Sequence, residues 1–421
     1  MSDNNDIKAN AEVVELSKEL GLKEALGIAV GALIGGGVFS VLGLVISNTG
    51  PGAFLSFILA GIVSAFTAYS YVHLALRYPR AGGAFIYAQE AFKSKKLSGT
   101  LGIILWFGYS FSISLYAMAF GWYLGEVWHL FGDKILTLPF YDVNISSFVF
   151  QILSIILFIG INLLGIKETS RTQNVLVLVK ISILVLYVIV GIFAVKKSNF
   201  TDPAFLVNGF MPVIASSVLI FVSMEGFEIL SNSVEEMKNA EKDLPIGMFL
   251  SIIIVLILYV SVAIITVGVL GWSVELKDIG EVILTHSAEV FLKSAGKWIM
   301  AFAAIISAAS AINATLLGSS RLSYMLSHEK VIPGAISKIN RKTRVPTRAI
   351  LASGIISIVF VLIFSIEIVA TAASIIFMLV FGMVNISAVK LLEGKKKIPS
   401  IVGIILIVLY WCFWFWQLLA T

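Results

Sequence analysis

Long apolar stretches alternate with short polar segments along nearly the whole chain. A helix needs ~20 mainly apolar residues to cross ~30 Å of hydrocarbon, and a window of that length gives about eleven candidates. The pattern therefore predicts an all-α polytopic membrane protein. The predicted spans cover approximately residues 25–47, 51–76, 84–91 leading into 98–130, 147–165, 174–195, 209–232, 245–271, 294–325, 348–364, 369–389 and 398–419.

The composition agrees with a lipid environment. Hydrophobic residues make up 58% of the 421 residues and charged residues 13%, which leaves more apolar surface than a soluble fold buries. The net charge of +5 does not indicate a nucleic acid partner, because Lys and Arg lie in short segments between apolar stretches. The single cysteine, Cys412, has no partner for a disulfide or a zinc site, and we expect no metal and no cofactor.

Positive charge is distributed unequally between alternate sides of the predicted spans. With the N-terminus inside, 23 Lys and Arg fall on the cytoplasmic side and 6 outside, while Lys180 lies within a span. Residues 1–24 are polar and lack the apolar core of a cleavable signal peptide. We expect a multi-pass protein of the cell (plasma) membrane with 1–24 as a cytoplasmic segment and, after about eleven spans, an extracellular C-terminus.

Two predicted spans contain residues that disfavour a continuous helix. Gly31–Ser40, GALIGGGVFS, has four glycines within seven residues, and each costs ~1 kcal/mol relative to alanine in a helix interior. Ser223–Glu228, SMEGFE, places two carboxylates and a glycine at mid-span, where charge is costly. Non-helical backbone at membrane depth is tolerated where protein or a water-filled cavity surrounds it, so the paired breaks predict a central binding site. The alternative is that the glycines serve close helix packing.

The spacing of the two breaks predicts an internal repeat. Five spans separate them, so residues 25–195 and 209–389 are interpreted as inverted copies, each led by a broken helix. Residues 398–419 then form an additional peripheral helix. This arrangement is typical of secondary transporters.

Three motifs, in this order, resemble those of the amino acid-polyamine-organocation permeases, and the likeness covers roughly residues 20 to 390. They are Leu33-Ile34-Gly35-Gly36-Gly37-Val38-Phe39, then Tyr78-Pro79-Arg80-Ala81-Gly82-Gly83-Ala84-Phe85, then Gly226-Phe227-Glu228 with Glu235-Glu236-Met237-Lys238-Asn239 and Leu244-Pro245. Where this chain has Gly35-Gly36-Gly37, the family usually has Gly-Ser-Gly or Gly-Ala-Gly. Where it has Asn239-Ala240, the family usually has Asn-Pro. It also usually has a twelfth helix. The resemblance implies a 5+5 inverted repeat (LeuT-like) core and amino acids as substrates.

The polarity of the two breaks fits a zwitterion. Unwinding at Gly35, Gly36 and Gly37 leaves free N–H groups at the positive start of a half-helix, where a carboxylate binds well. Carbonyls that end the first half-helices point partial negative charge at an ammonium group. We expect these carbonyls at Leu33, Ile34, Val222 and Ser223, and we expect Phe221, Glu225 and Gly226 to line the same site.

Lys180 interrupts an otherwise apolar helix. It lies ~9 Å from the predicted helix start, so its stem can also snorkel toward the interface. The other interpretation is a proton carrier, because an ionisable group within the membrane is by default a functional candidate. The resemblance implies that its ammonium takes the place of a cation, contacting the Gly31 carbonyl and hydroxyls of the eighth helix, with Ser307 and Ser310 as candidates.

The remaining candidates lie near the second break and in the third helix. By resemblance, Glu228 is associated with gating and proton sensing. Glu225 is a candidate partner for a cationic substrate side chain, a second proton site, or one half of a structural salt bridge. Phe221 and Phe227 are candidate thin gates, and Tyr109 and Tyr116 candidate pocket residues, although such aromatic residues more often serve packing.

These observations favour a transporter, with proton symport of amino acids ahead of amino acid exchange or transport of polyamines and cationic amino acids. An intramembrane enzyme is disfavoured because the chain lacks a G-x-S-x-G or H-E-x-x-H motif. A channel is disfavoured because polarity concentrates at two breaks and one lysine rather than along a pore. We expect the lipid bilayer and a small-molecule amino acid as partners, and the sequence gives no signal for oligomeric state.

Overall fold

The protein is described by a computed structural model over residues 20–35, 37–80, 82–129, 137–138, 141–201, 205–207, 209–273, 282–340 and 342–420. Apart from turns and short loops, the described chain is helical except for one antiparallel pair of short strands, β1 (Thr137–Leu138) and β2 (Tyr141–Asn144). Residues 1–19 of the expected N-terminal segment 1–24 lie outside the described residues.

The described part of the first half of the chain contains seven α-helices. They are α1 (Leu22–Leu33), α2 (Gly37–Thr49), α3 (Ala53–Arg77), α4 (Ala84–Phe92), α5 (Lys95–His129), α6 (Ile145–Leu163) and α7 (Ile166–Gly191), with the short 3-10 helices η1 (Gly50–Gly52), η2 (Ile192–Ala194) and η3 (Lys197–Phe200). The first predicted span is therefore two helices, because α1 ends just before the glycine run and α2 begins within it.

The second half repeats this interruption. Its first span consists of α8 (Met211–Ile220) and the 3-10 helices η4 (Phe221–Met224) and η5 (Phe227–Glu236). The following helices are α9 (Ala240–Leu270), α10 (Ile283–Leu292), α11 (Ser294–His328), α12 (Thr347–Ile363), α13 (Ile366–Leu391) and α14 (Ile398–Ala420), with η8 (Gly334–Ser337) and η9 (Gly394–Lys397). The helix α10 was not predicted, and the inverted relation between the two halves stays a prediction.

Nine stretches of the described chain are long and apolar enough to cross a membrane. Two shorter apolar helices, Ser147–Leu163 and Thr347–Ile363, coincide with two further predicted spans. The protein is thus a multi-pass membrane protein, which agrees with the large apolar side chains exposed along its helices, such as Leu178 (69% exposed) and Ile257 (64%).

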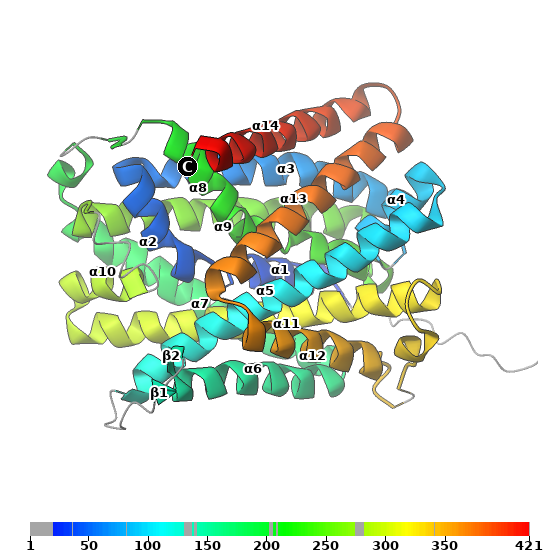
Figure 1. Ribbon diagram of the computed structural model, residues 1–421, viewed down its shortest axis with the longest axis horizontal. Coiled ribbons are helices and arrows are strands. Elements are labelled where there is room, and N and C mark those ends of the chain that lie inside the picture. The colour runs from blue at the N-terminus through cyan, green and yellow to red at the C-terminus, as the bar shows by residue number, and fades with distance from the viewer. Residues whose placement is uncertain are drawn as a thin grey trace, which may run out of the picture.

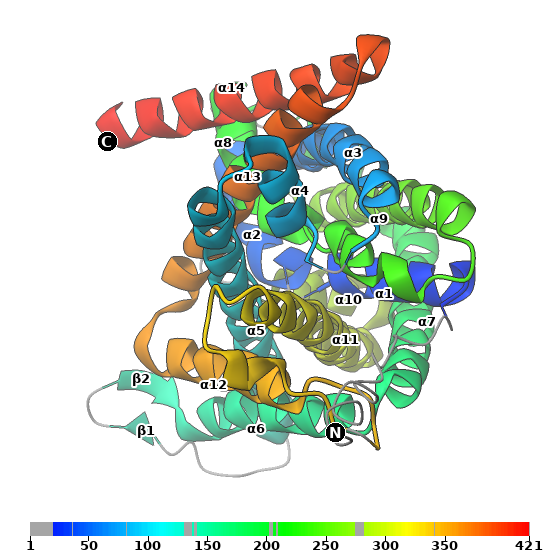
Figure 2. The same ribbon diagram turned by 90° about the vertical axis from the view of Figure 1, so that its right-hand side faces the viewer.

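Most long helices run along one direction of the molecule (Figure 1), and Figure 2 looks along them. In both views α14 lies at one outer edge and α6 at the opposite edge. The helices α5 and α11 cross near the middle, and α1 lies beside α7, α9 and α11. The interrupted helices are therefore surrounded by protein, as backbone without helical hydrogen bonds requires in a membrane.

Candidate functional site

The two interruptions touch each other directly. Gly226 has a φ of +117°, a conformation that L side chains rarely adopt. A Cβ built on Gly226 lies 2.6 Å from the Cβ of Ala32 and 2.9 Å from the backbone nitrogen of Leu33. Only a glycine lets the turn of the second break approach the end of α1 this closely.

The glycine run on the other side is packed just as tightly. A Cβ on Gly35 would lie 2.6 Å from the ring of Tyr116, and a Cβ on Gly37 would overlap Ser223. These two glycines therefore bring both interrupted backbones and α5 together at one place. Gly36, a predicted member of the site, lies outside the described residues.

The last carbonyls of α1 accept hydrogen bonds from side chains of other helices. Lys180 Nζ donates to the carbonyl oxygens of Gly31 at 2.9 Å and Ile34 at 2.6 Å. The hydroxyl of Tyr259 on α9 donates to Leu33 O at 2.8 Å. The end of α1, where a helix normally leaves carbonyls unsatisfied, is thereby tied to α7 and α9.

Ser310 completes the surroundings of Lys180. Lys180 Nζ donates to Ser310 Oγ at 2.7 Å, and Ser310 Oγ donates to Gly31 O at 3.0 Å. The ammonium is fully buried, its three N–H groups match three oxygens, and none of these oxygens belongs to a carboxylate. Ser307, the other candidate on α11, is buried without a hydrogen bond among the described residues.

This geometry bears on the expected ammonium site. The Leu33 carbonyl already accepts from Tyr259 and from the backbone N–H of Gly35 at 3.0 Å, which uses both of its lone pairs. The Ile34 carbonyl accepts from Lys180 and has a second lone pair. Val222 and Ser223 lie in η4 and are buried, and the hydroxyl of Ser223 makes no hydrogen bond within the described chain. The assignment of these groups to a substrate stays a prediction.

Both carboxylates of the second break are buried. Ser112 on α5 donates to Glu225 Oε1, while Glu225 Oε2 has no hydrogen-bond partner in the described part of the chain. Glu228 turns back on the break, where its Oε2 accepts from the backbone N–H of Gly226 at 2.6 Å. Glu228 thus stabilises the unusual backbone of the break, whatever further role it has.

Aromatic side chains cover the second break. Phe221 and Phe227 each pack against Phe381 of α13, with ring centroids 5.5 and 5.4 Å away. Tyr109 accepts a long hydrogen bond of 3.4 Å from Asn232. The two phenylalanines proposed as gates are therefore packed in an aromatic cluster in this conformation, and a gating role is not tested by it.

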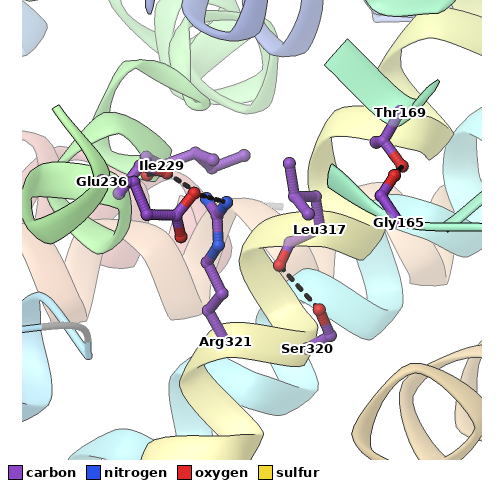
Figure 3. A network of polar contacts seen from close by, with 8 residues as sticks. Gly165, Thr169, Ile229, Glu236, Leu317, Ser320 and Arg321 are labelled. Atoms are coloured by element: carbon purple, nitrogen blue, oxygen red, sulfur yellow. Dashed lines mark hydrogen bonds and ion pairs between the residues drawn. The ribbon is translucent and has the colours of Figure 1, made fainter. Parts of the chain in front are cut away.

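A buried ion pair holds the end of the second interrupted helix. Arg321 of α11 lies 2.7 Å from Glu236 of η5, with both side chains less than 8% exposed, and it also donates to Ser233. Figure 3 shows Arg321 turned toward Glu236, while Ser320 of the same helix points elsewhere and donates to Leu317 O. Within the described residues, no group of three His, Cys, Asp or Glu side chains could hold a metal ion.

Several polar residues at the site were missed in the sequence. Tyr259 lies in an apolar helix whose periodicity does not show which face is buried. Gln173, Asn313 and Asn162 are neutral amides on helices, each at most 1% exposed. Asn313 and Asn162 lie within predicted spans, which was the available signal, whereas Gln173 lies one residue before the predicted span 174–195.

Comparison with known proteins supplies a family. A family model described as "Amino acid permease" matches residues 20–421. Among curated proteins whose names state a substrate, a branched-chain amino acid permease of Bacillus subtilis is 27% identical, covering 93% of this chain and 85% of the relative. A methylthioribose transporter of the same species is 27% identical over 83% and 76%. A vacuolar cationic amino acid transporter of Arabidopsis thaliana is 27% identical over 92% and 62%.

Proposed function

This chain belongs to the amino acid permease family, a family of transporters rather than enzymes, and we propose that it carries amino acids across the cell membrane by proton-coupled symport. The observation that carries the coupling is the buried ammonium of Lys180, which binds the carbonyls of Gly31 in α1 and of Ile34 just after it, and Ser310 of α11. A positive charge at this place links the first half-helix to the opposite repeat.

The protonation state of Lys180 controls this link. The charged amine has three N–H donors and no lone pair, whereas the neutral amine has two donors and one acceptor site. Loss of the proton therefore withdraws at least one of the three hydrogen bonds and places a lone pair against carbonyl oxygens. The end of α1 is then held less firmly, which favours the conformation in which α1 has moved.

An α-amino acid suits the two breaks. The backbone N–H groups at the start of α2 favour a carboxylate, and the carbonyls that end the first half-helices favour an ammonium. Methylthioribose, which the name of one relative states, carries neither a carboxylate nor an ammonium. The presence of both kinds of backbone group supports an amino acid as the better substrate.

We further propose the expected orientation, with the N-terminus in the cytoplasm and the C-terminus outside. The charged segments that precede α1, α5, α7, α9, α12 and α14 lie at ends that the alternation of helices assigns to one side, and they carry 23 of the 30 Lys and Arg. Cysteine accessibility at both termini in intact cells tests this orientation.

The test is uptake of a panel of labelled amino acids into proteoliposomes with and without an imposed pH gradient. Wild type is expected to concentrate an amino acid only with an inward proton gradient. Lys180→Ala is expected to bind the same amino acid and to lose the response to pH. Uptake that requires sodium, or that requires an internal amino acid and ignores Lys180, would contradict proton coupling.

A second candidate is transport of cationic amino acids, which Glu225 favours. Its Oε2 is buried beside the break without a hydrogen-bond partner in the described residues, and a basic substrate side chain would supply one. Competition of uptake by arginine and lysine against leucine separates this candidate from transport of apolar amino acids.

A further inference from the structure

A chain of buried amide side chains leads away from the Lys180 site. Gln173 of α7 donates through Nε2 to Ser310 Oγ at 3.1 Å. Asn313 of α11 donates through Nδ2 to Gln173 Oε1 at 3.0 Å, and Asn162 of α6 donates through Nδ2 to Asn313 Oδ1 at 2.9 Å. The consecutive helices α6 and α7 are thus joined to the distant helix α11 by hydrogen bonds that all point toward Ser310.

Backbone carbonyls fix the direction of this chain. Asn162 Nδ2 also donates to Phe158 O at 2.9 Å, and Asn313 Nδ2 also donates to Thr169 O at 3.2 Å. Rotating either amide by 180° would place its oxygen against a carbonyl oxygen. The donors therefore face Ser310 in the lowest-energy arrangement, and successive hydrogen bonds in one direction strengthen one another.

The chain determines what Ser310 offers to Lys180. Ser310 Oγ accepts from Gln173 and from Lys180, and its single hydrogen goes to Gly31 O. While Gln173 donates to Ser310 Oγ, the hydroxyl hydrogen of Ser310 stays directed at Gly31 O and not at the amine of Lys180. Ser310 is thereby held as an acceptor, which is the partner that a charged amine requires.

Asn162, the end of the hydrogen-bond chain that is farthest from Ser310, lies at a pocket. Asn162 Oδ1 is buried without a hydrogen bond among the described residues. Asn162 lines this pocket together with Tyr324, Arg344 and Pro346. The pocket lies toward the end of α11 and the start of α12, so the last acceptor of the chain faces the side of the protein on which α7 begins.

The hydrogen-bond partners of Lys180 are uncharged groups. In the described part of the chain no salt bridge involves Lys180, and the titratable side chain of Tyr259 binds a neighbouring carbonyl, Leu33 O, rather than the two that Lys180 binds. On α11, Lys297 and Arg321 are more than ten residues from Ser310. The other charged or titratable groups on elements packed against α7, or on α7 itself, lie away from Lys180 along the helices: Lys23, Glu24, Arg171, Tyr187, Glu241, Lys242, Asp243, His286, Glu289, Tyr324 and His328.

We propose that Gln173, Asn313 and Asn162 are positioning residues whose one-way hydrogen-bond chain holds Ser310 as an acceptor for Lys180 and so sets the pH at which the carrier works. This inference rests on the proposed proton coupling. It assigns a role in transport to residues that contact neither the substrate site nor, in the case of Asn313 and Asn162, Lys180.

The test compares Asn313→Leu with wild type in exchange of the labelled amino acid that wild type accumulates, measured in proteoliposomes across a range of pH. Leucine at position 313 removes the donor that orients Gln173, so Ser310 is free to turn its hydrogen toward the amine. The midpoint of the pH profile is expected to move to lower pH by about one unit, the size of one hydrogen bond to a charged group.

Asn385→Leu is the matched control, since Asn385 is an equally buried amide on α13 that donates to Thr67. It is expected to lower thermal stability without moving the midpoint. If Asn313→Leu does not fold, Asn162→Leu at the far end is expected to give a shift in the same direction. If the folded variants have the same pH midpoint as wild type, the inference about the amide side chains is overturned, while proton coupling still stands. A flat profile in wild type itself overturns both.

Discussion

The hydroxyl of Tyr259 lies 2.8 Å from the carbonyl oxygen of Leu33, the last residue of α1. The bond joins α9 to the end of a helix that has no further turn to satisfy its carbonyls. Tyr259 is completely buried, so water does not replace the hydroxyl if it is removed. The contact therefore stabilises the interrupted conformation of the first span rather than the helix alone.

Tyr259→Phe is expected to destabilise the protein by ~0.5–1.5 kcal/mol, because it removes a buried hydrogen bond while Leu33 O keeps the one from the Gly35 backbone N–H. It is also expected to weaken amino acid binding, since Leu33 belongs to the proposed site. Thermal unfolding and a binding isotherm in detergent measure the two effects.

Tyr187→Phe is the control for this variant. Tyr187 is a buried tyrosine that bonds Thr266 and Ser287 away from the breaks. It should lower stability and leave affinity unchanged. Equal affinities for wild type and Tyr259→Phe would show that the bond has no part in binding.

Much of this architecture could be predicted from the sequence because its causes are local. The glycine run at Gly35–Gly37 interrupts a helix by intrinsic propensity, and the structure ends α1 at Leu33. The depth of Lys180 in an apolar helix marked it as a candidate, and the Gly31 carbonyl and Ser310 are its partners. The length of the apolar stretches was enough to locate the predicted spans.

The partners of α1 could not be predicted, because they depend on how helices rotate against each other. In a span that is apolar on every side, periodicity does not distinguish the face that carries Tyr259 from the lipid face. Lys180 binds the Ile34 carbonyl because its side chain extends from α7 to the end of α1. The turn of Glu228 onto Gly226 likewise depends on the break having formed.

Gly226→Ala is expected to abolish transport by folded protein. An alanine at a φ of +117° is strained, by ~1–2 kcal/mol, and its Cβ would meet Ala32 at 2.6 Å. The two breaks would have to separate. Uptake normalised to the amount of folded protein in proteoliposomes measures the effect.

Gly209 offers a matched control, because it also has a positive φ, of +77°, but a Cβ there meets nothing within 4 Å. Gly209→Ala is expected to carry backbone strain and to retain transport. If both variants transport equally, close approach of the two breaks is not required.

The buried pair of Arg321 and Glu236 gives a prediction on stability. Arg321→Met leaves Glu236 without its guanidinium partner in a buried place, which is expected to cost ~3–5 kcal/mol. The double variant Arg321→Met with Glu236→Gln should recover part of this loss, since no charge remains buried. Thermal unfolding in detergent measures both.

Lys93 and Glu90 provide the comparison, because they form an ion pair whose lysine side chain is 75% exposed. Lys93→Met is expected to change stability by less than ~1 kcal/mol. A double variant at 321 and 236 that is less stable than Arg321→Met would show that the ion pair is not the reason for the loss.

Glu225 distinguishes the substrate classes. If its carboxylate meets a basic substrate side chain, Glu225→Gln lowers the preference for arginine over leucine by ~10- to 100-fold, the range for hydrogen bonds to charged groups. Glutamine keeps an oxygen that can accept from Ser112, so the break itself is preserved. Ser112→Ala is the control, since it removes the hydroxyl and leaves the charge. A preference that falls equally in both variants would assign Glu225 to the structure of the break, and an unchanged preference with an unchanged pH profile would exclude it from both substrate recognition and proton binding.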